Sequence, residues 1–216
     1  SCINTMKAEV IKKGGLLEYY PKGTGDKMEF VGGLDLLKQW LASRKRSFTD
    51  VKEASEFGLP TPRGILLCGV PGSGKSIVAK AVANCWGLPL LRFDPGKAFG
   101  SLVGQSEERI RMVCTQASAM ASCVLWIDEV EKGMSGLGSS GYTDSGVTAR
   151  VFGTFLTWMQ ENTAPVFVIA TANSIAGLPP ELVRRFSEIW SVDLPTSPER
   201  EEIWKIHITK PRLAHK

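Results

Sequence analysis

The chain has 216 residues, of which 43% are hydrophobic and 22% are charged. These proportions are typical of a globular protein with a hydrophobic core of its own, and they exclude a disordered, collagen-like or disulfide-stapled chain. The net charge of +4 is too small an excess to indicate a nucleic-acid or membrane-surface protein. We therefore expect no membrane partner, and the charge disfavours a nucleic-acid partner.

The cysteines and histidines argue against a zinc site, and the hydropathy pattern argues against a membrane span or a signal peptide. Five cysteines are irregularly spaced, no C-x-x-C pair occurs, and the only histidines are His207 and His215, so we expect no zinc site. No apolar run approaches the roughly 20 residues of a membrane span, and the first 20 residues lack the order of a signal peptide. We expect a reducing compartment, the cytoplasm or, if the protein is organellar, the plastid stroma. The cysteines are Cys2, Cys68, Cys85, Cys114 and Cys123.

The first predicted elements precede residue 64. Residues 34–44 form an amphipathic pattern that predicts a helix, and residues 48–57 suggest a second one. Residues 1–30 are rich in turn-forming residues, and their pattern identifies neither a helix nor a strand.

From residue 64 onward, short apolar runs alternate with segments of helical period. This alternation is typical of a parallel sheet covered by helices on both faces, so the predicted fold class is α/β. The expected strands are 64–68, 88–93, 123–127, 165–170 and 188–192, and the expected helices are 75–86, 106–121 and 148–160. The stretch from Gly133 to Gly146, rich in glycine and serine, interrupts the pattern. It is either an inert surface loop or a contact with a substrate or neighbour.

The segment from Gly69 to Ser76 fits the pattern G-x-x-x-x-G-K-[ST] of a phosphate-binding loop. Its glycines let several backbone N–H groups point at one phosphate, and the helix that follows adds the positive end of its dipole. Lys75 supplies a charge for the β- and γ-phosphates, and the Ser76 hydroxyl is suited to Mg²⁺. The loop follows a predicted strand and opens a predicted helix, as the motif requires.

Two acids end the strand predicted at 123–127. Asp128 would lie at the carboxyl edge of the sheet beside the phosphate-binding loop, where ligands of open α/β sheets bind. We expect Asp128 to hold Mg²⁺ through water and Glu129 to polarise the attacking water as a general base. The alternative is that both acids merely cap the next helix.

Asn173 follows the strand predicted at 165–170, within Ala170-Thr171-Ala172-Asn173. An amide at this edge is suited to hydrogen bonds with both the γ-phosphate and the water. Taken alone, an Asn in this place is typical of a turn. Its assignment to the site rests on the neighbouring motifs.

Together these residues resemble the AAA branch of the AAA+ ATPases over roughly residues 28–210. Gly69–Ser76 is similar to Walker A, Asp128-Glu129 to Walker B and Asn173 to sensor 1. The resemblance implies a P-loop NTPase fold with a five-stranded parallel sheet of order 5-1-4-3-2 and a helical lid. It also implies ATP and Mg²⁺ as cofactors. Several stretches are similar to a cyanobacterial and plastid AAA subgroup, among them residues 15–21, 123–128 and 150–158.

Further positions carry roles by resemblance alone. Val31 and Gly32 lie in a segment similar to the one whose backbone contacts adenine, and His207 is similar to a histidine near the nucleotide at the start of the lid. Arg185, with Arg184 as the alternative, is similar to the arginine finger that completes the site of a neighbouring subunit. The residues that the resemblance places around the phosphates are Pro71, Gly72, Ser73, Gly74, Lys75, Ser76 and Ile77.

The sequence departs from the family pattern in three places. The finger motif is two residues short, and Glu188 stands where a second arginine often lies. In the stretch similar to the pore loop, Leu102 replaces the usual aromatic residue, with Phe99 as a shifted substitute. The chain also stops at the start of the lid, which leads us to expect a fragment. The expected domains are a linker over 1–27, the large ATPase subdomain over 28–196 and the start of a truncated lid over 197–216.

The functional hypothesis is an ATPase that remodels a protein partner within a ring of identical subunits, which the resemblance implies is a hexamer. Two alternatives stay open: a nucleotide-gated scaffold with little hydrolysis, and a motor acting on nucleic acid. The modest net charge argues against the second alternative.

Overall fold

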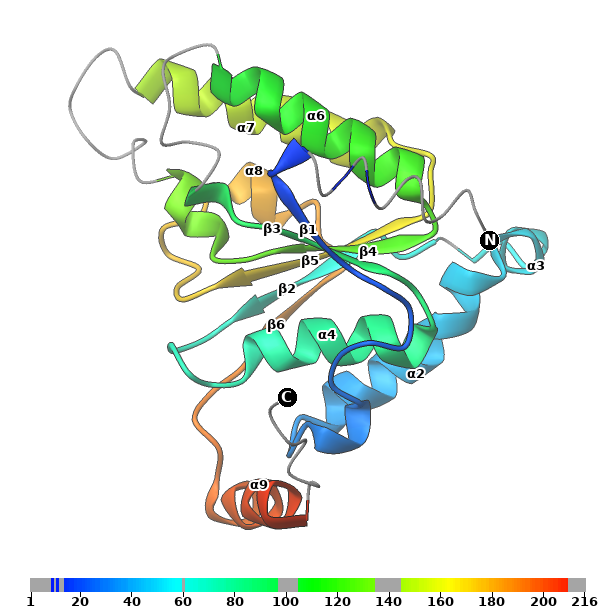
Figure 1. The fold of residues 1–216 in the computed structure, drawn as a ribbon, viewed down its shortest axis with the longest axis vertical. Helices are drawn as coiled ribbons and strands as arrows, with labels where there is room; N and C mark the ends of the chain where they lie inside the picture. The colour runs from blue at the N-terminus through cyan, green and yellow to red at the C-terminus, as the bar shows by residue number, and fades with distance from the viewer. Residues whose placement is uncertain are drawn as a thin grey trace.

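A six-stranded sheet forms the centre of the molecule in the computed structural model, which describes residues 14–59, 61–96, 105–134 and 145–209 together with Glu9 and Ile11. The strand order is β1-β3-β4-β5-β2-β6 (Figure 1). The strands from β3 to β6 in this order are parallel, and they follow the predicted order 5-1-4-3-2. The strands are β1 (Leu17–Tyr20), β2 (Gly64–Cys68), β3 (Leu90–Phe93), β4 (Cys123–Ile127), β5 (Val166–Ala172) and β6 (Glu188–Ser191).

Strand β1 corrects the prediction of a five-stranded sheet. It runs antiparallel to β3 at the edge, with Leu17 opposite Phe93 and Tyr20 opposite Leu90. The sheet therefore extends into the segment 1–27, which we expected to be a linker. A strand of four residues between turns is too short to show a clear period of two, which is why the sequence pattern missed it.

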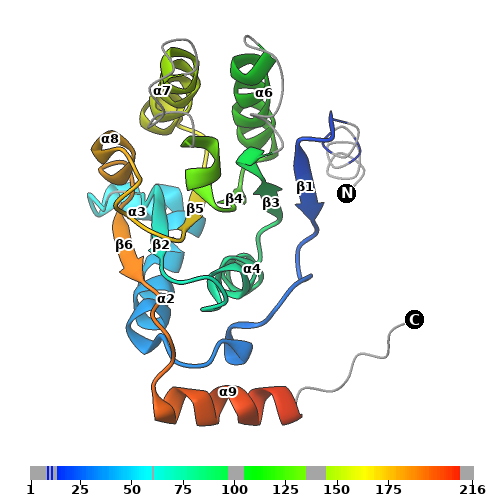
Figure 2. The same cartoon turned by 90° about the vertical axis from the view of Figure 1, so that its left-hand side faces the viewer.

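Helices cover both faces of the sheet. Figures 1 and 2 show α2 and α4 on one face and α6 and α7 on the other. The predicted helix at 75–86 is confirmed residue for residue, whereas α2 runs five residues further than the helix predicted at 34–44. The helices are η1 (Met28–Phe30), α2 (Asp35–Thr49), α3 (Val51–Glu56), α4 (Lys75–Trp86), α6 (Gln105–Met120), η2 (Val130–Met134), α7 (Ser145–Glu161), α8 (Pro180–Val183) and α9 (Ser197–Thr209).

Alternation along the strands divides the interior into two cores. In β2, Leu66 joins the core under α6 and α7, while Ile65 and Leu67 join the core under α2 and α4. All three side chains are fully buried, and each contributes about 1.5–3 kcal/mol by leaving water. Packing on both faces fixes the position of the strand. The residues that directly follow the strand therefore have a defined position at the edge of the sheet.

Two of the described cysteines, Cys114 and Cys123, are core residues, whereas Cys68 is half-buried. Cys123 on β4 is fully buried, and burial raises the pKa of its thiol to about 12. The thiol of Cys114 on α6 is raised to about 12 for the same reason. Cys68, Cys85, Cys114 and Cys123 are free thiols, and the two buried ones are too weakly acidic to react as thiolates.

The last helix, α9, packs against the segment that follows η1. The Gly33 N–H donates to Glu202 Oε2 at 3.0 Å, and a Cβ at Gly32 would collide with the side chain of Ile203. The expected boundary at residue 197 coincides with the start of α9. The division of the chain into domains is still a proposal.

Some expectations concern residues outside the described part of the chain. The residues Phe99 and Leu102, and most of the stretch from Gly133 to Gly146, lie there. Within the described ranges, none of the helices combines the length and apolar character needed to cross a membrane.

Candidate active site

The phosphate-binding loop joins the carboxyl end of β2 to the start of α4. A Cβ at Gly69 would collide with the carbonyl oxygen of Val192, so the backbone passes too close to the strand end for any side chain. Gly72 and Gly74 have φ of +83° and +96°, in the left-handed region that glycine adopts without strain. These three positions explain locally why the loop can turn directly from a buried strand into a helix.

Lys75 is the first residue of α4 and is 7% exposed. Its Nζ donates to the carbonyl oxygens of Gly69 at 2.7 Å and Val70 at 2.8 Å, so the ammonium lies inside the curve of the loop. An ammonium has three donors, and these two bonds are compatible with a third to a phosphate oxygen.

The other residues of the loop face outward in the described structure. Pro71, Gly72 and Ser76 are exposed, as is the neighbouring Ile77. The Ser73 hydroxyl is a buried polar atom without a hydrogen-bond partner among the described residues. A buried hydroxyl of this kind is a candidate for a bond with a ligand, since buried polar groups are rarely left unpaired.

Asp128 follows β4 at the same edge of the sheet as the loop. Its backbone N–H donates to Phe93 of β3, which extends the strand ladder by one residue. The carboxylate is 16% exposed and receives Arg92 Nη2 at 2.7 Å and Arg92 Nε at 3.3 Å on Oδ2. The other oxygen, Oδ1, lies 3.1 Å from the hydroxyl of Thr171.

Thr171 connects the two acids of this edge. It is 1% exposed on β5, its Oγ1 accepts the backbone N–H of Glu129 at 3.0 Å, and the same hydroxyl can donate to Asp128. Glu129 has a φ of +54°, an uncommon conformation for a residue with a side chain. The bond from Thr171 supports this turn, and sequence reasoning missed its role.

Glu129 and Asn173 lie in contact at the ends of the neighbouring strands β4 and β5. Asn173 Nδ2 donates to Glu129 Oε1 at 3.3 Å, and the Asn173 N–H donates to Glu131 Oε1 at 2.9 Å. The second carboxylate oxygen of Glu129 pairs with Lys132 Nζ. The hydrogen bond from Lys132 lowers the pKa of Glu129, burial opposes that change, and Asn173 adds to it. Glu129 is therefore ionised at neutral pH.

Arg92 is a second residue that sequence reasoning missed. It is the charged member of a strand that otherwise reads Leu90, Leu91 and Phe93, and it connects Asp128 to Glu18 of β1. The signal was present in the sequence, because a lone arginine in a buried strand needs an anionic partner.

Of the two positions that the resemblance assigns to adenine, Gly32 lies against α9. Val31 is 6% exposed, and Gly32 packs against Ile203 of α9. His207 is exposed one turn further along that helix. The described structure thus brings Gly32 to the helix that carries His207, while the histidine ring itself faces outward.

The two candidate arginine fingers lie in a different turn from the phosphate-binding loop and the acidic pair Asp128-Glu129. Arg184 is exposed and Arg185 half-buried in the turn between α8 and β6. Among the described residues, neither side chain forms a hydrogen bond or ion pair with Lys75, Asp128 or Glu129. The Nε of Arg185 is buried without a hydrogen-bond partner in that part of the chain.

The donors at this edge fit magnesium but could not enclose it. Asp128 and Ser76 offer oxygen atoms, which Mg²⁺ prefers. The described residues contain no group of three or more His, Cys, Asp or Glu side chains placed to hold a metal. A magnesium ion here would complete its shell with phosphate oxygens and water, as it commonly does in phosphoryl-transfer sites.

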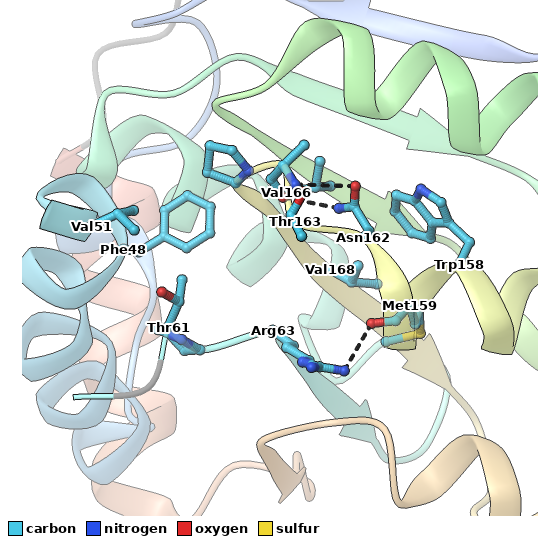
Figure 3. A pocket seen from close by; sticks show the side chains of 13 residues that line it. Phe48, Val51, Thr61, Arg63, Trp158, Met159, Asn162, Thr163, Val166 and Val168 are labelled. Carbon is cyan, nitrogen blue, oxygen red and sulfur yellow. Dashed lines mark hydrogen bonds between the residues drawn. The ribbon is translucent and has the colours of Figure 1, made fainter. Parts of the chain in front are cut away.

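A cavity of about 520 Å³ lies at the opposite, amino-terminal edge of the sheet. Figure 3 shows Arg63 and Thr61, just before β2, facing Thr163 and Val166 at the start of β5, with Phe48 at one side. The Arg63 guanidinium donates to the carbonyl oxygen of Met159 at 3.1 Å. None of the residues predicted for the site lines this cavity.

Comparison with known proteins identifies the family of proteins to which this chain belongs. The family model described as "ATPase family associated with various cellular activities (AAA)" matches residues 65–194. The match begins in β2, ends beyond β6, and includes Lys75, Asp128, Glu129 and Asn173. The chain belongs to this AAA family, whose general chemistry is ATP binding and hydrolysis, and the resemblance read from the sequence is confirmed.

Individual relatives narrow the comparison. The "Uncharacterized AAA domain-containing protein ycf46" of Pyropia yezoensis is 52% identical over 208 residues, which is 95% of this chain and 41% of that protein. The "Cell division cycle protein 48 homolog" of Archaeoglobus fulgidus is 34% identical over 87% of this chain and 26% of its own length. The "ATP-dependent zinc metalloprotease FTSH 6, chloroplastic" of Arabidopsis thaliana is 33% identical over 88% and 28%. The chain spans about two fifths of the ycf46 protein that it matches.

Proposed function

We propose that this chain binds ATP with Mg²⁺ and hydrolyses it, with Glu129 as the base that polarises the attacking water. The observation that supports this best is the contact between Glu129 Oε1 and Asn173 Nδ2 at the end of the sheet where the phosphate-binding loop begins. An ionised carboxylate next to an amide can accept a proton from water while the amide keeps that water in place.

The loop residues would bind the phosphates. The N–H groups of residues 72–76 and the positive end of α4 attract the negative charge, and Lys75 adds its ammonium. Ser76 and Asp128 would hold Mg²⁺, Asp128 through water. When bound, the ion neutralises charge that develops on the β- and γ-phosphates.

The proposal extends to an assembly of identical subunits. Since Arg184 and Arg185 do not reach Glu129 within one chain, we propose that Arg185, with Arg184 as the alternative, completes the site of a neighbouring subunit in a ring, which we expect to be a hexamer. An arginine supplied in trans accelerates related phosphoryl transfers by about 10³–10⁵. Coupling of the ring to the remodelling of a protein partner, and the placing of residues 197–216 in a lid, are parts of the same proposal.

We also propose a reducing compartment for the protein, because the four described cysteines are free. The cytoplasm satisfies this condition. The plastid stroma satisfies it equally, and the Arabidopsis relative has "chloroplastic" in its name.

One observation favours a second candidate function, a nucleotide-gated scaffold with little hydrolysis. Lys132 pairs directly with Glu129, and this cation competes with water for the carboxylate oxygen that a base needs. If the pair persists with ATP bound, the site would bind nucleotide without turning it over.

The experiment is steady-state ATP hydrolysis per subunit with Mg²⁺, measured over a wide range of protein concentration for the chain and for Glu129→Gln. We expect turnover to fall by at least about 100-fold in the variant, the usual scale of a lost general base, while a fluorescent ATP analogue still binds. Glu53→Gln, on the remote helix α3, is the matched control. Unchanged turnover in Glu129→Gln would exclude Glu129 as the base.

The same measurement separates the two candidate functions. A specific rate that rises steeply with concentration, and collapses in Arg185→Ala, supports hydrolysis completed in trans. A rate near zero at all concentrations, with the analogue bound, supports the scaffold. A substantial rate that does not depend on concentration would contradict the arginine supplied by a neighbour.

A further inference from the structure

Arg92 holds the Asp128 carboxylate from the side of the sheet that faces α4. Two of its donors, Nη2 at 2.7 Å and Nε at 3.3 Å, converge on Asp128 Oδ2. The planar guanidinium offers both donors in a fixed geometry, so this contact defines the orientation of the carboxylate as well as attracting its charge.

The remaining side of the guanidinium connects to β1, the strand that the sequence pattern missed. Arg92 Nη1 donates to Glu18 Oε2 at 3.0 Å, and Glu18 is the residue directly opposite Arg92 in the strand register. The hydroxyl of Tyr20 donates to the same Glu18 oxygen at 3.1 Å. Strand β1 therefore contributes a carboxylate to a row that ends at Asp128.

Arg92 itself has little freedom to move. Its side chain is 28% exposed, and the guanidinium carbon lies 5.0 Å from the centre of the Trp126 ring. Burial disfavours its charged form, but the hydrogen bonds that Arg92 donates to Asp128 and Glu18 outweigh that effect and raise the pKa of Arg92. The group is permanently charged, so the row Glu18–Arg92–Asp128 carries a net charge of −1.

We propose that Arg92 is a positioning residue of the magnesium site, which fixes the Asp128 carboxylate and limits how strongly it attracts the ion. Glu18 of β1 offsets part of the arginine charge and so sets that limit. With Oδ2 engaged by Arg92, Oδ1, which also accepts from the Thr171 hydroxyl, is the oxygen that would accept from a metal-bound water. This inference rests on the proposed function, since it assigns further residues to the same site.

Neutral substitutions of Arg92 and Glu18, the two partners of one ion pair, should change the Mg²⁺ affinity in opposite directions. Arg92→Gln raises the negative charge of the row to −2 and should tighten Mg²⁺ binding, whereas Glu18→Gln reduces it to zero and should weaken it. Each shift should be about three- to tenfold, the scale of one charge at this range near a protein surface. Arg92→Lys keeps the charge but loses the fork, so it should retain the Mg²⁺ midpoint of the unsubstituted chain and lose turnover.

The test is a titration of Mg²⁺ that follows the affinity for a fluorescent ATP analogue, with affinity in EDTA as the reference. We expect the midpoints to increase in the order Arg92→Gln, then the unsubstituted chain together with Arg92→Lys, then Glu18→Gln. The matched control is Arg46→Gln, which removes another arginine with two bonds to one carboxylate, that of Glu53, far from this edge. Its midpoint should not move.

The outcomes distinguish this inference from the proposal on which it rests. If the unsubstituted chain shows Mg²⁺-dependent binding and all variants share its midpoint, the ion pair is purely structural and the inference is overturned. Shifts of Arg92→Gln and Glu18→Gln in the same direction overturn it as well. If Arg92→Gln fails to fold, Glu18→Gln and Arg92→Lys still decide the order. If the unsubstituted chain binds no nucleotide, the proposed function fails first and this inference fails with it.

Discussion

The two edges of the parallel sheet differ in how their polar side chains are bonded, and the volume of the cavity does not reveal this difference. The amino-terminal edge carries a cavity of about 520 Å³ (Figure 3), and two of the polar side chains that line it, Arg63 and Asn162, are bonded to the backbone around them. Arg63 bonds to the Met159 carbonyl, and Asn162 bonds to both backbone groups of Ala164.

At the carboxyl edge, groups from different strands converge on one another. Asp128 follows β4, Thr171 ends β5 and Arg92 lies on β3, and hydrogen bonds join all three. Such convergence arises because the carboxyl ends of parallel strands open onto one crevice. The comparison indicates that hydrogen bonds between side chains of separate strands identify the candidate site better than the size of a cavity does.

The largest expected effect tests the carboxyl edge directly. Lys75→Ala removes a buried ammonium that bonds to two loop carbonyls and that we propose contacts the phosphates. We expect the affinity for a fluorescent ATP analogue to fall by at least about 100-fold, because hydrogen bonds to a charged group contribute about 1.5–3 kcal/mol each. The measurement is an equilibrium titration of the analogue.

Lys45 of α2, which bonds to the carboxyl-terminal end of α4, provides the control. Lys45 Nζ donates to the carbonyl oxygen of Cys85 at 2.8 Å, so it also bonds to backbone near a helix terminus. Lys45→Ala should keep the affinity of the unsubstituted chain. Equal losses in both variants would mean that the helix, and not the phosphate contact, had been damaged.

The sequence predicted the parts of this edge that depend on continuous local patterns. The buried strands at 64–68 and 123–127 and the helix at 75–86 have the predicted bounds. A buried apolar run followed by Gly-rich or acidic residues contains its own start and stop signals. The strand order that the resemblance implies places β4 beside β5, and the contact between Glu129 and Asn173 at their ends is a finding of the structure.

The parts that the sequence did not predict depend on pairing between distant segments. Strand β1 exists because it pairs with β3, and its four residues carry no strong signal alone. Thr171 reads as one more β-branched residue of a buried strand until its hydroxyl is placed beside Asp128. Arg92 was visible as a charge in an apolar run, but its partners lie on two other strands.

A medium effect, on stability alone, is expected at the amino-terminal edge. Asn162 accepts from Ser118 Oγ at 3.1 Å and bonds to the backbone of Ala164 on both sides of its amide. Asn162→Ala leaves these groups unpaired, and we expect the free energy of unfolding to fall by about 1–3 kcal/mol. Urea unfolding measures this loss, and the affinity for the ATP analogue should not change.

This outcome would sharpen the contrast between the two ends of the sheet. Loss of nucleotide affinity in Asn162→Ala, at a temperature where the variant is folded, would show that the cavity is coupled to the carboxyl edge. A control is Ser118→Ala, which removes one partner of Asn162 and also the acceptor of the Trp158 indole N–H. It should destabilise the chain in the same direction.

The smallest expected effect concerns the pH dependence of turnover. The hydrogen bond from Lys132 is the largest influence that lowers the pKa of Glu129. A base must be ionised, so activity is lost as pH falls through the pKa of Glu129, and the lowered value places that loss below the ordinary range of a glutamate. Lys132→Met removes the cation, raises this pKa, and should move the acid limb of the profile to higher pH.

The rate at neutral pH adds a second sign to the same variant. If Lys132 competes with water for Glu129, Lys132→Met should increase turnover where Glu129 is fully ionised, even as the acid limb moves up. Lys205→Met, which breaks the exposed pair with Glu201 on α9, is the matched control and should leave the profile in place. An acid limb that stays fixed in Lys132→Met would mean that a group other than Glu129 limits the reaction at low pH. The role of base would then pass to another member of the carboxyl edge, while the contrast with the amino-terminal edge would stand.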